Sequence, residues 1–293
     1  VANSSLSPVY QDFLLQELHL RIGNFNLFSH GGHPLKMIEF INDCLMTVFF
    51  LAVGLEIKRE LLVGELSSVR KAALPFIAAC GGMVVPVVIY ALSVASGTPE
   101  TRGMAIPMAT DIAFSLGVLS LLGKRVPLSL KIFLTAFAVV DDIGGILVIA
   151  LFYSADVAYG YLIAAAVLYV FLYYMGKFGV TQKIFFLFFG VIIWYLFLQS
   201  GIHSTISGVI LAFVIPARPR LDAGKYIERI RDIIGEFPVS KSDNIVLTNA
   251  QIATLKQVER ASDYVISPLQ SLEDNLHGAV SFVILPLFAF ANA

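Results

Sequence analysis

Three aspartates lie within two apolar stretches of this chain that are each long enough to cross a membrane. Asp111 lies in residues 104–123, and the adjacent Asp141 and Asp142 lie in residues 128–153. A charged carboxylate at the centre of a bilayer costs at least about 2.5 kcal/mol, so such residues are rare and mark ion paths or proton relays. Two adjacent carboxylates, with a third near them in sequence, therefore predict a site that handles cations.

The adjacent pair suits an exchange of protons for cations. The side chains of Asp141 and Asp142 point about 100° apart on a helix, so one can face a cavity while the other faces a neighbouring helix and its cation. Burial and mutual repulsion favour protonated carboxylates, and hard cations prefer oxygen ligands, so protons and cations can compete for one group. Gly144 and Gly145 follow directly and would let another backbone approach. The alternative is a structural ion pair with a lysine elsewhere.

The stretch around Asp111 is predicted to be a broken helix. Pro107 removes a helical hydrogen bond, and Thr110 with Asp111 can cap a new helix start. Unwound backbone at membrane depth is tolerated only where it is buried in protein or lines a cavity. A carboxylate there would offset the positive ends of two half-helices. The alternative is a proline kink in which Asp111 serves as a structural cap.

Charged residues at the end of the first apolar stretch could form a mouth that attracts cations. Glu56 and Glu60 are one helical turn apart, with Lys58 and Arg59 beside them. Glu273 and His277 open the last apolar stretch and could extend this mouth. The alternative is that both groups are ordinary solvated helix ends or caps.

His203 and Asp43 have less specific surroundings. His203 lies in the run Ser200–Gly208 and could sense pH, but a hydrogen bond between helices is the plainer interpretation. Asp43 is flanked by apolar residues and is interpreted as a polar residue that packs between helices.

The composition excludes an ordinary soluble domain. Of the 293 residues, 57% are hydrophobic and 14% are charged, whereas soluble domains carry about 25% charged residues. The formal net charge is −1, and the Lys and Arg residues form no patch that indicates nucleic-acid binding. Cys44 and Cys80 lie in apolar runs and indicate neither a disulfide framework nor a metal cluster. We therefore predict an all-α polytopic membrane protein with the lipid bilayer as its main partner.

The apolar pattern divides the chain into four parts. Residues 1–33 form an external segment, 34–216 hold seven transmembrane helices, 217–275 form a cytoplasmic insert, and 276–293 begin a further transmembrane helix. A helix that spans a bilayer needs about 20 apolar residues. The eight stretches that we interpret as spans are 34–56, 74–95, 104–123, 128–153, 157–175, 184–199, 203–216 and 276–293.

The connections between these stretches alternate in charge. Lys and Arg gather in 57–73, 124–127, 176–183 and 217–275. The positive-inside rule places these connections in the cytoplasm, which leaves residues 1–33 outside.

Three local features complete the prediction. Leu18–Phe28 alternates and predicts a small external β-hairpin with Gly23 and Asn24 at its turn. Asn249–Leu276 has helical periodicity and is expected to lie along the cytoplasmic face. The chain starts at Val1 and ends inside an apolar run, so we expect both ends to be cut.

Five stretches carry a resemblance to a known family. The runs MATDIAF, within Ala105–Val118, and VVDDIGG, within Val126–Ala150, are highly specific together. Ile41–Leu61, Ser200–Gly208 and Leu285–Ala293 also match. With these motifs the chain resembles the NhaA family of bacterial sodium/proton antiporters over nearly its whole length, apart from the long insert.

The resemblance implies an inverted-repeat transporter fold with broken helices. The family has twelve helices, and the eight stretches resemble its second to ninth, so only one arm of the repeat, 74–153, would be complete. Asp142 would be the principal sodium ligand, with Asp141 as its partner and as the mate of a lysine on an absent helix. Asp111 with Thr110 would form the charged break in the first crossed helix.

The resemblance also implies a pH-responsive funnel at the cytoplasmic side. The residues that match it are Glu56, Arg59, Glu60, Glu273 and His277. His203 matches a histidine linked to the pH response, whereas Asp274 departs from a pattern that often has histidine there.

The expected activity is pH-regulated exchange of cytoplasmic sodium or lithium for external protons by a multi-pass protein of the bacterial inner membrane. Such a protein is not an enzyme, needs no cofactor, binds no nucleic acid and could form a homodimer. The alternative is a sodium-coupled symporter of an organic solute. An intramembrane aspartyl protease is disfavoured, because its Gly-x-Gly-Asp motif is not in the sequence and adjacent aspartates do not form its catalytic pair.

Overall fold

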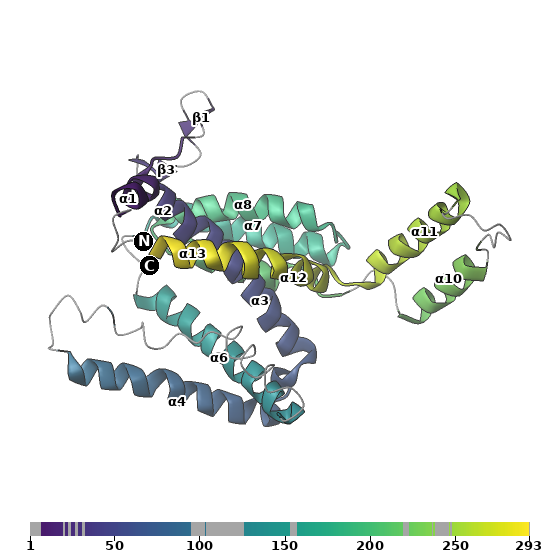
Figure 1. The fold of residues 1–293 in the computed structure, drawn as a ribbon, viewed down its shortest axis with the longest axis horizontal. Coiled ribbons are helices and arrows are strands. Elements are labelled where there is room, and N and C mark those ends of the chain that lie inside the picture. The colour runs from purple at the N-terminus through teal and green to yellow at the C-terminus, as the bar shows by residue number, and fades with distance from the viewer. Residues whose placement is uncertain are drawn as a thin grey trace.

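The computed structural model describes most of the chain, and Figure 1 shows its fold. The described residues are 7–19, 21–22, 25–26, 29–30, 33–94, 103, 126–152, 157–218, 223–235, 237, 246 and 248–292. Thr110, Asp111 and the broken helix that is expected around Pro107 lie outside these residues.

Helices dominate the described structure. In chain order they are α1 Ser7–Leu15, α2 Met37–Phe40, η1 Ile41–Leu45, α3 Met46–Val63, η2 Glu65–Ser67, α4 Val69–Ser93, α6 Leu128–Phe152, α7 Tyr159–Lys177, α8 Lys183–Ser200, α9 Thr205–Val214, α10 Ala223–Gly235, α11 Asn249–Val265, α12 Pro268–Ala279, η5 Val280–Ile284 and α13 Leu285–Asn292. The elements η1 and η5 are single π-helical turns inside longer continuous helices.

Several helices are long and apolar enough to cross a membrane. Among the described residues there are five, namely Met37–Val63, Arg70–Ser93, Tyr159–Lys177, Lys183–Ser200 and Pro268–Asn292. The chain is therefore an all-α polytopic membrane protein, as its composition predicts. The inverted repeat stays a prediction.

The first and last spans are longer than the apolar pattern predicts. The first span continues past Glu56 to Val63, because the residues that follow Glu56 favour a helix until Gly64 ends it. The last span begins at Pro268 instead of Leu276. Ser267 caps its first turn with its side chain, and a proline suits the first position of a helix.

Two small hairpins lie near the start of the chain. β1 (Arg21–Ile22) pairs antiparallel with β2 (Phe25–Asn26), as the alternating stretch predicts, and the expected turn residues Gly23 and Asn24 lie outside the described residues. β3 (Ser29–His30) pairs with β4 (His33–Pro34) in a second hairpin. The sequence does not predict this second hairpin.

α1 lies at the same end of the molecule and packs on the last span. The Tyr10 hydroxyl donates a hydrogen bond to the carbonyl of Phe290 at 2.6 Å, and the two rings meet edge to face. The first and last described parts of the chain therefore lie side by side, which Figure 1 also shows.

α3 and α9 run parallel and in close contact. Gly208 of α9 faces the backbone of α3, where an added Cβ would overlap the Thr47 carbonyl and lie 3.0 Å from the Leu51 nitrogen. Gly54 of α3 faces α9, where a Cβ would lie 2.8 Å from that of Ala212. One glycine from each helix thus lets the two backbones approach, as small residues do in membrane proteins.

The main buried core joins α3, α7, α8, α9 and α12. Its most deeply buried side chains include Leu55, Leu172, Phe186, Ile193 and Ile215. α4 and α6 pack together outside this group, and α3 crosses between the two groups (Figure 1). α3 is therefore the helix through which the α4–α6 pair is joined to the main core.

The long insert folds into a helical hairpin. α10 and α11 pack against one another, and the hydroxyls of Tyr226 and Ser262 lie 2.9 Å apart. The hairpin projects beyond the start of α12, away from the spanning helices (Figure 1). The helix expected over 249–276 is in fact two helices, because the residue before Pro268 is disfavoured in an α-helix and the chain turns there.

Candidate ion-exchange site

Asp141 and Asp142 lie near the middle of α6. Asp141 is 4% exposed, and Asp142 is partly exposed. The preceding residues Ala138, Val139 and Val140 are also buried. This stretch of α6 therefore faces other helices of the protein, which is where membrane proteins place ionisable side chains.

Side chains of α3 and α4 cover this part of α6. Val139 belongs to a buried cluster with Val53 and Ile57 of α3. Gly144 faces α4, where the nearest atoms to an added Cβ belong to the side chain of Met83. The close approach expected at this glycine is thus made by a flexible thioether rather than by a second backbone.

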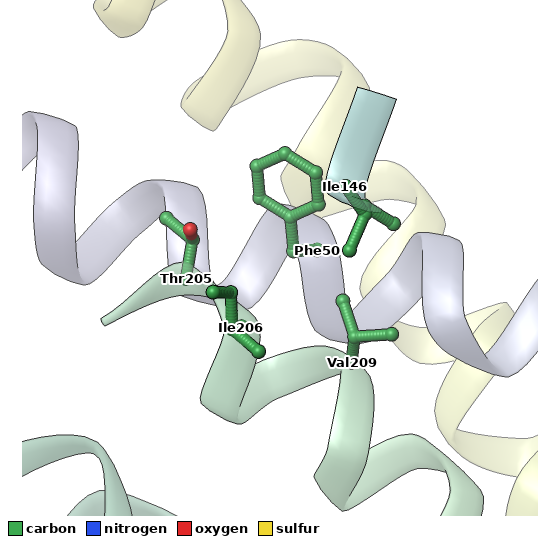
Figure 2. A pocket seen from close by; sticks show the side chains of 5 residues that line it. All are labelled: Phe50, Ile146, Thr205, Ile206 and Val209. Carbon is green, nitrogen blue, oxygen red and sulfur yellow. The ribbon is translucent and has the colours of Figure 1, made fainter. Parts of the chain in front are cut away.

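A small hollow lies where α3, α6 and α9 meet (Figure 2). Its lining residues are Phe50, Ile146, Thr205, Ile206 and Val209. Ile146 follows Asp142 by one helical turn and so shares its face of α6. Thr205 is the one hydroxyl-bearing residue among the side chains drawn in Figure 2, and it is buried. Residues of α9 therefore share this hollow with Ile146, which lies one helical turn from Asp142.

Asp43 joins the start of α3 to α8 and α9. Ser204 donates a hydrogen bond to Asp43 Oδ1 at 3.1 Å. Trp194 Nε1 donates another to the main-chain carbonyl of Asp43 at 3.3 Å. These contacts confirm the interpretation of Asp43 as a polar residue that packs between helices.

His203 contacts Thr205, one of the residues that line the hollow, and not another helix as the sequence suggests. Its Nδ1 is 3.3 Å from Thr205 Oγ1, a contact within the start of α9. The hydrogen bond to another helix that the sequence suggests for His203 is made instead by its neighbour Ser204. Thr205 has no distinguishing signal in the sequence, because its place in the lining of the hollow depends on how α9 packs on α3.

The charged residues predicted to form a cytoplasmic mouth come together from two helices. Arg59 Nε lies 2.9 and 3.2 Å from the two carboxylate oxygens of Glu273, and another Arg59 nitrogen lies 3.0 Å from Glu60. Glu56 is close enough to interact electrostatically with Glu273, Arg59, Glu60 and His277. The cluster ties α3 to α12, so it is more than a pair of independent solvated helix ends.

Lys58, which the sequence indicates only as a member of the charged helix end, contacts a distant part of the chain. Its Nζ donates hydrogen bonds to the carbonyls of Ala212 and Phe213, at 3.3 and 2.7 Å, and to that of Ile215. These acceptors lie at the end of α9, far away in sequence, so no local pattern could indicate them.

Sodium would be the cargo of this site. Across the described residues, no group of three or more His, Cys, Asp or Glu side chains lies close enough to hold a metal ion. Thr110 and Asp111, the expected neighbours of the aspartate pair, lie outside those residues. The assignment of Asp141 and Asp142 as sodium ligands stays a prediction.

Comparison with known proteins identifies the family. The family model described as Na+/H+ antiporter 1 matches residues 1–293. The chain belongs to the Na+/H+ antiporter 1 family. It is 77% identical to the Na(+)/H(+) antiporters NhaA of Bacteroides thetaiotaomicron and Bacteroides fragilis over 293 residues, which are the whole chain and 67% of each relative. It is 49% identical to the NhaA of Porphyromonas gingivalis over 298 residues, which are 66% of that relative.

Membership of this family supports sodium/proton antiport and places the chain among bacterial multi-pass membrane transporters. It gives no support to the alternative of a sodium-coupled symporter. The chain spans about two thirds of the length of the curated relatives that it matches.

Proposed function

We propose that the complete protein exchanges cytoplasmic sodium or lithium for external protons across the bacterial inner membrane. The observation that carries this proposal is the pair of adjacent aspartates in the middle of α6, packed among helices of an Na+/H+ antiporter chain. The family resemblance adds the direction of exchange, a homodimer and the inner membrane to the proposal.

Asp142 is the carboxylate that exchanges the ions, and Asp141 is its partner. Asp142 is the more exposed of the two, whereas Asp141 is almost fully buried. A carboxylate that can hold either a proton or a sodium ion, but not both, couples the release of one to the binding of the other. Competition at Asp142 therefore produces antiport without any chemical step.

Asp111 and Thr110 form the charged break of a neighbouring helix in this proposal. Pro107 and the capping pair support a break, and Asp111 would offset the positive ends of the half-helices. Asp111 then shapes the field around the exchange site instead of binding the ion directly.

The cytoplasmic cluster sets the pH response. Protonation of Glu56 would remove its electrostatic repulsion with Glu273 and so change the interaction between α3 and α12. His203 would contribute from the start of α9 through its contact with Thr205.

The test is sodium-induced proton release from everted membrane vesicles that contain the full-length protein, with no organic solute present. Asp142→Asn should abolish this release while leaving the amount of protein in the membrane unchanged. Vesicles from cells without the protein give the background. Release at a near wild-type rate by Asp142→Asn would overturn the assignment of Asp142.

A further inference from the structure

Lys58 reaches from α3 to the end of α9. Its Nζ donates to three main-chain carbonyls there, those of Ala212, Phe213 and Ile215. The last carbonyls of a helix have no donors of their own within the helix. They also carry the negative end of the helix dipole, which attracts a cation. Lys58 thus meets both the hydrogen-bonding need and the charge of this helix end.

A proline just beyond α9 makes the contacts of Lys58 more important, because it cannot donate a hydrogen bond to the helix end. The residue that follows Ile215 is Pro216, which has no N–H to donate to the last turn. The Pro216 carbonyl instead accepts a hydrogen bond from the nitrogen of Leu269, at the start of α12. The end of α9 is therefore held by side-chain and main-chain donors from two other helices.

α3 fixes the position of α9 at three levels. At the first level, Ser204 donates to Asp43. In the middle, Gly208 and Gly54 allow the two helices to pack closely. At the far end, Lys58 holds the last turn of α9. Contacts at both ends prevent α9 from sliding along α3, because any slide would break at least one of them.

This position matters for the exchange site. α9 supplies Thr205, Ile206 and Val209 to the hollow beside Ile146, which lies one turn from Asp142 on α6. A one-residue change of register moves a helix by about 1.5 Å and turns it by about 100°, so it would replace the α9 side chains that line the hollow.

We propose that Lys58 is a positioning residue for ion exchange, which holds α9 in register on α3 and so fixes the α9 residues that share the hollow with Ile146, one helical turn from Asp142. The proposal rests on the proposed function. It is separate from the role of Arg59, because Arg59 points to α12 and Lys58 to α9.

The first test measures apparent sodium affinity and maximal rate in vesicles with the full-length protein. Lys58→Met should raise the half-saturating sodium concentration at least about threefold, since hydrogen bonds from a charged donor are among the stronger ones. Lys58→Arg, which keeps the charge and the donors, should restore it to within about twofold. Lys225→Met, which removes an exposed lysine of the insert, is the matched control and should behave as wild type.

A role in stability alone would give another result. In that case Lys58→Met would lower the maximal rate in proportion to the amount of folded protein, and the half-saturating sodium concentration would not change. That outcome would overturn the proposal. If Lys58→Met does not reach the membrane, Lys58→Gln, which keeps donors but is too short to reach all three carbonyls, replaces it with the same expectation.

The second test does not depend on transport. Hydrogen–deuterium exchange of the purified full-length protein should show faster exchange of residues 209–217 in Lys58→Met or Lys58→Gln than in wild type or Lys58→Arg. Equal exchange in all variants would refute the anchoring role. If the wild-type protein releases no protons with sodium, the proposed function fails, and this second measurement still decides whether Lys58 anchors α9.

Discussion

Replacing Gly208 with alanine should destabilise the protein, because the added methyl group has no room between α9 and α3. The new Cβ would overlap the Thr47 carbonyl and lie 3.0 Å from the Leu51 nitrogen, and both are backbone atoms of α3. Backbone cannot move aside as a side-chain end can, so the two helices must separate. Overpacking of this kind costs about 1–3 kcal/mol.

Two other glycines make matched controls. An alanine at Gly144 would press on the flexible side chain of Met83, which can change its rotamer, so the cost should be smaller. An alanine at Gly278 meets no atom within 4 Å, and alanine favours a helix over glycine by about 1 kcal/mol. The expected order of stability is therefore Gly278→Ala at or above wild type, then Gly144→Ala, then Gly208→Ala.

The assay is thermal unfolding of the full-length protein in detergent, followed by the loss of monodisperse protein on size exclusion after heating. Gly208→Ala should shift the midpoint downward by several degrees. If Gly208→Ala and Gly278→Ala have the same midpoint as wild type, α9 does not sit against the backbone of α3, and the argument for its fixed position fails with it.

Two further predictions concern transport. Asp111→Asn, which can still cap a helix, should weaken apparent sodium affinity less than Asp142→Asn does, and equal losses would make Asp111 a direct ligand. Glu273→Gln should move the pH midpoint of exchange toward acidic values. The negative charge of Glu273 repels that of Glu56 in the cluster with Glu60, His277 and Arg59, so its removal makes Glu56 easier to deprotonate. Sodium-induced proton release measured across a pH series tests this, and a midpoint shift toward alkaline values or no shift would contradict it.

Much of the membrane fold can be predicted because its elements are set by local sequence. A run of apolar residues as long as the bilayer is thick forms a spanning helix whatever surrounds it. The hairpin between β1 and β2 likewise follows from Gly23 and Asn24 at a turn between alternating residues. The aspartate pair can also be found from local sequence, because two charged residues inside an apolar run are unusual whatever their contacts in the fold.

Contacts between distant segments could not be predicted. Lys58 looks like one member of a charged helix end, and only the fold shows that it donates to the last turn of α9. Arg59 pairs with Glu273 on α12, and nothing in the local sequence indicates that partner. The contact of Met83 with Gly144 could not be predicted either, because it depends on how α4 packs on α6.

The π-helical turn at Ile41–Leu45 affects how this chain should be compared with its relatives. Such a turn holds one residue more than an α-helix would, so the positions before and after it are out of step by about 100°. Removing a single residue there would leave the sequence of α3 untouched, yet Glu56, Arg59 and Glu60 would point in a different direction relative to the start of the helix. A relative with one residue fewer at this place would therefore be expected to differ by a rotation of the helix and not merely by its length.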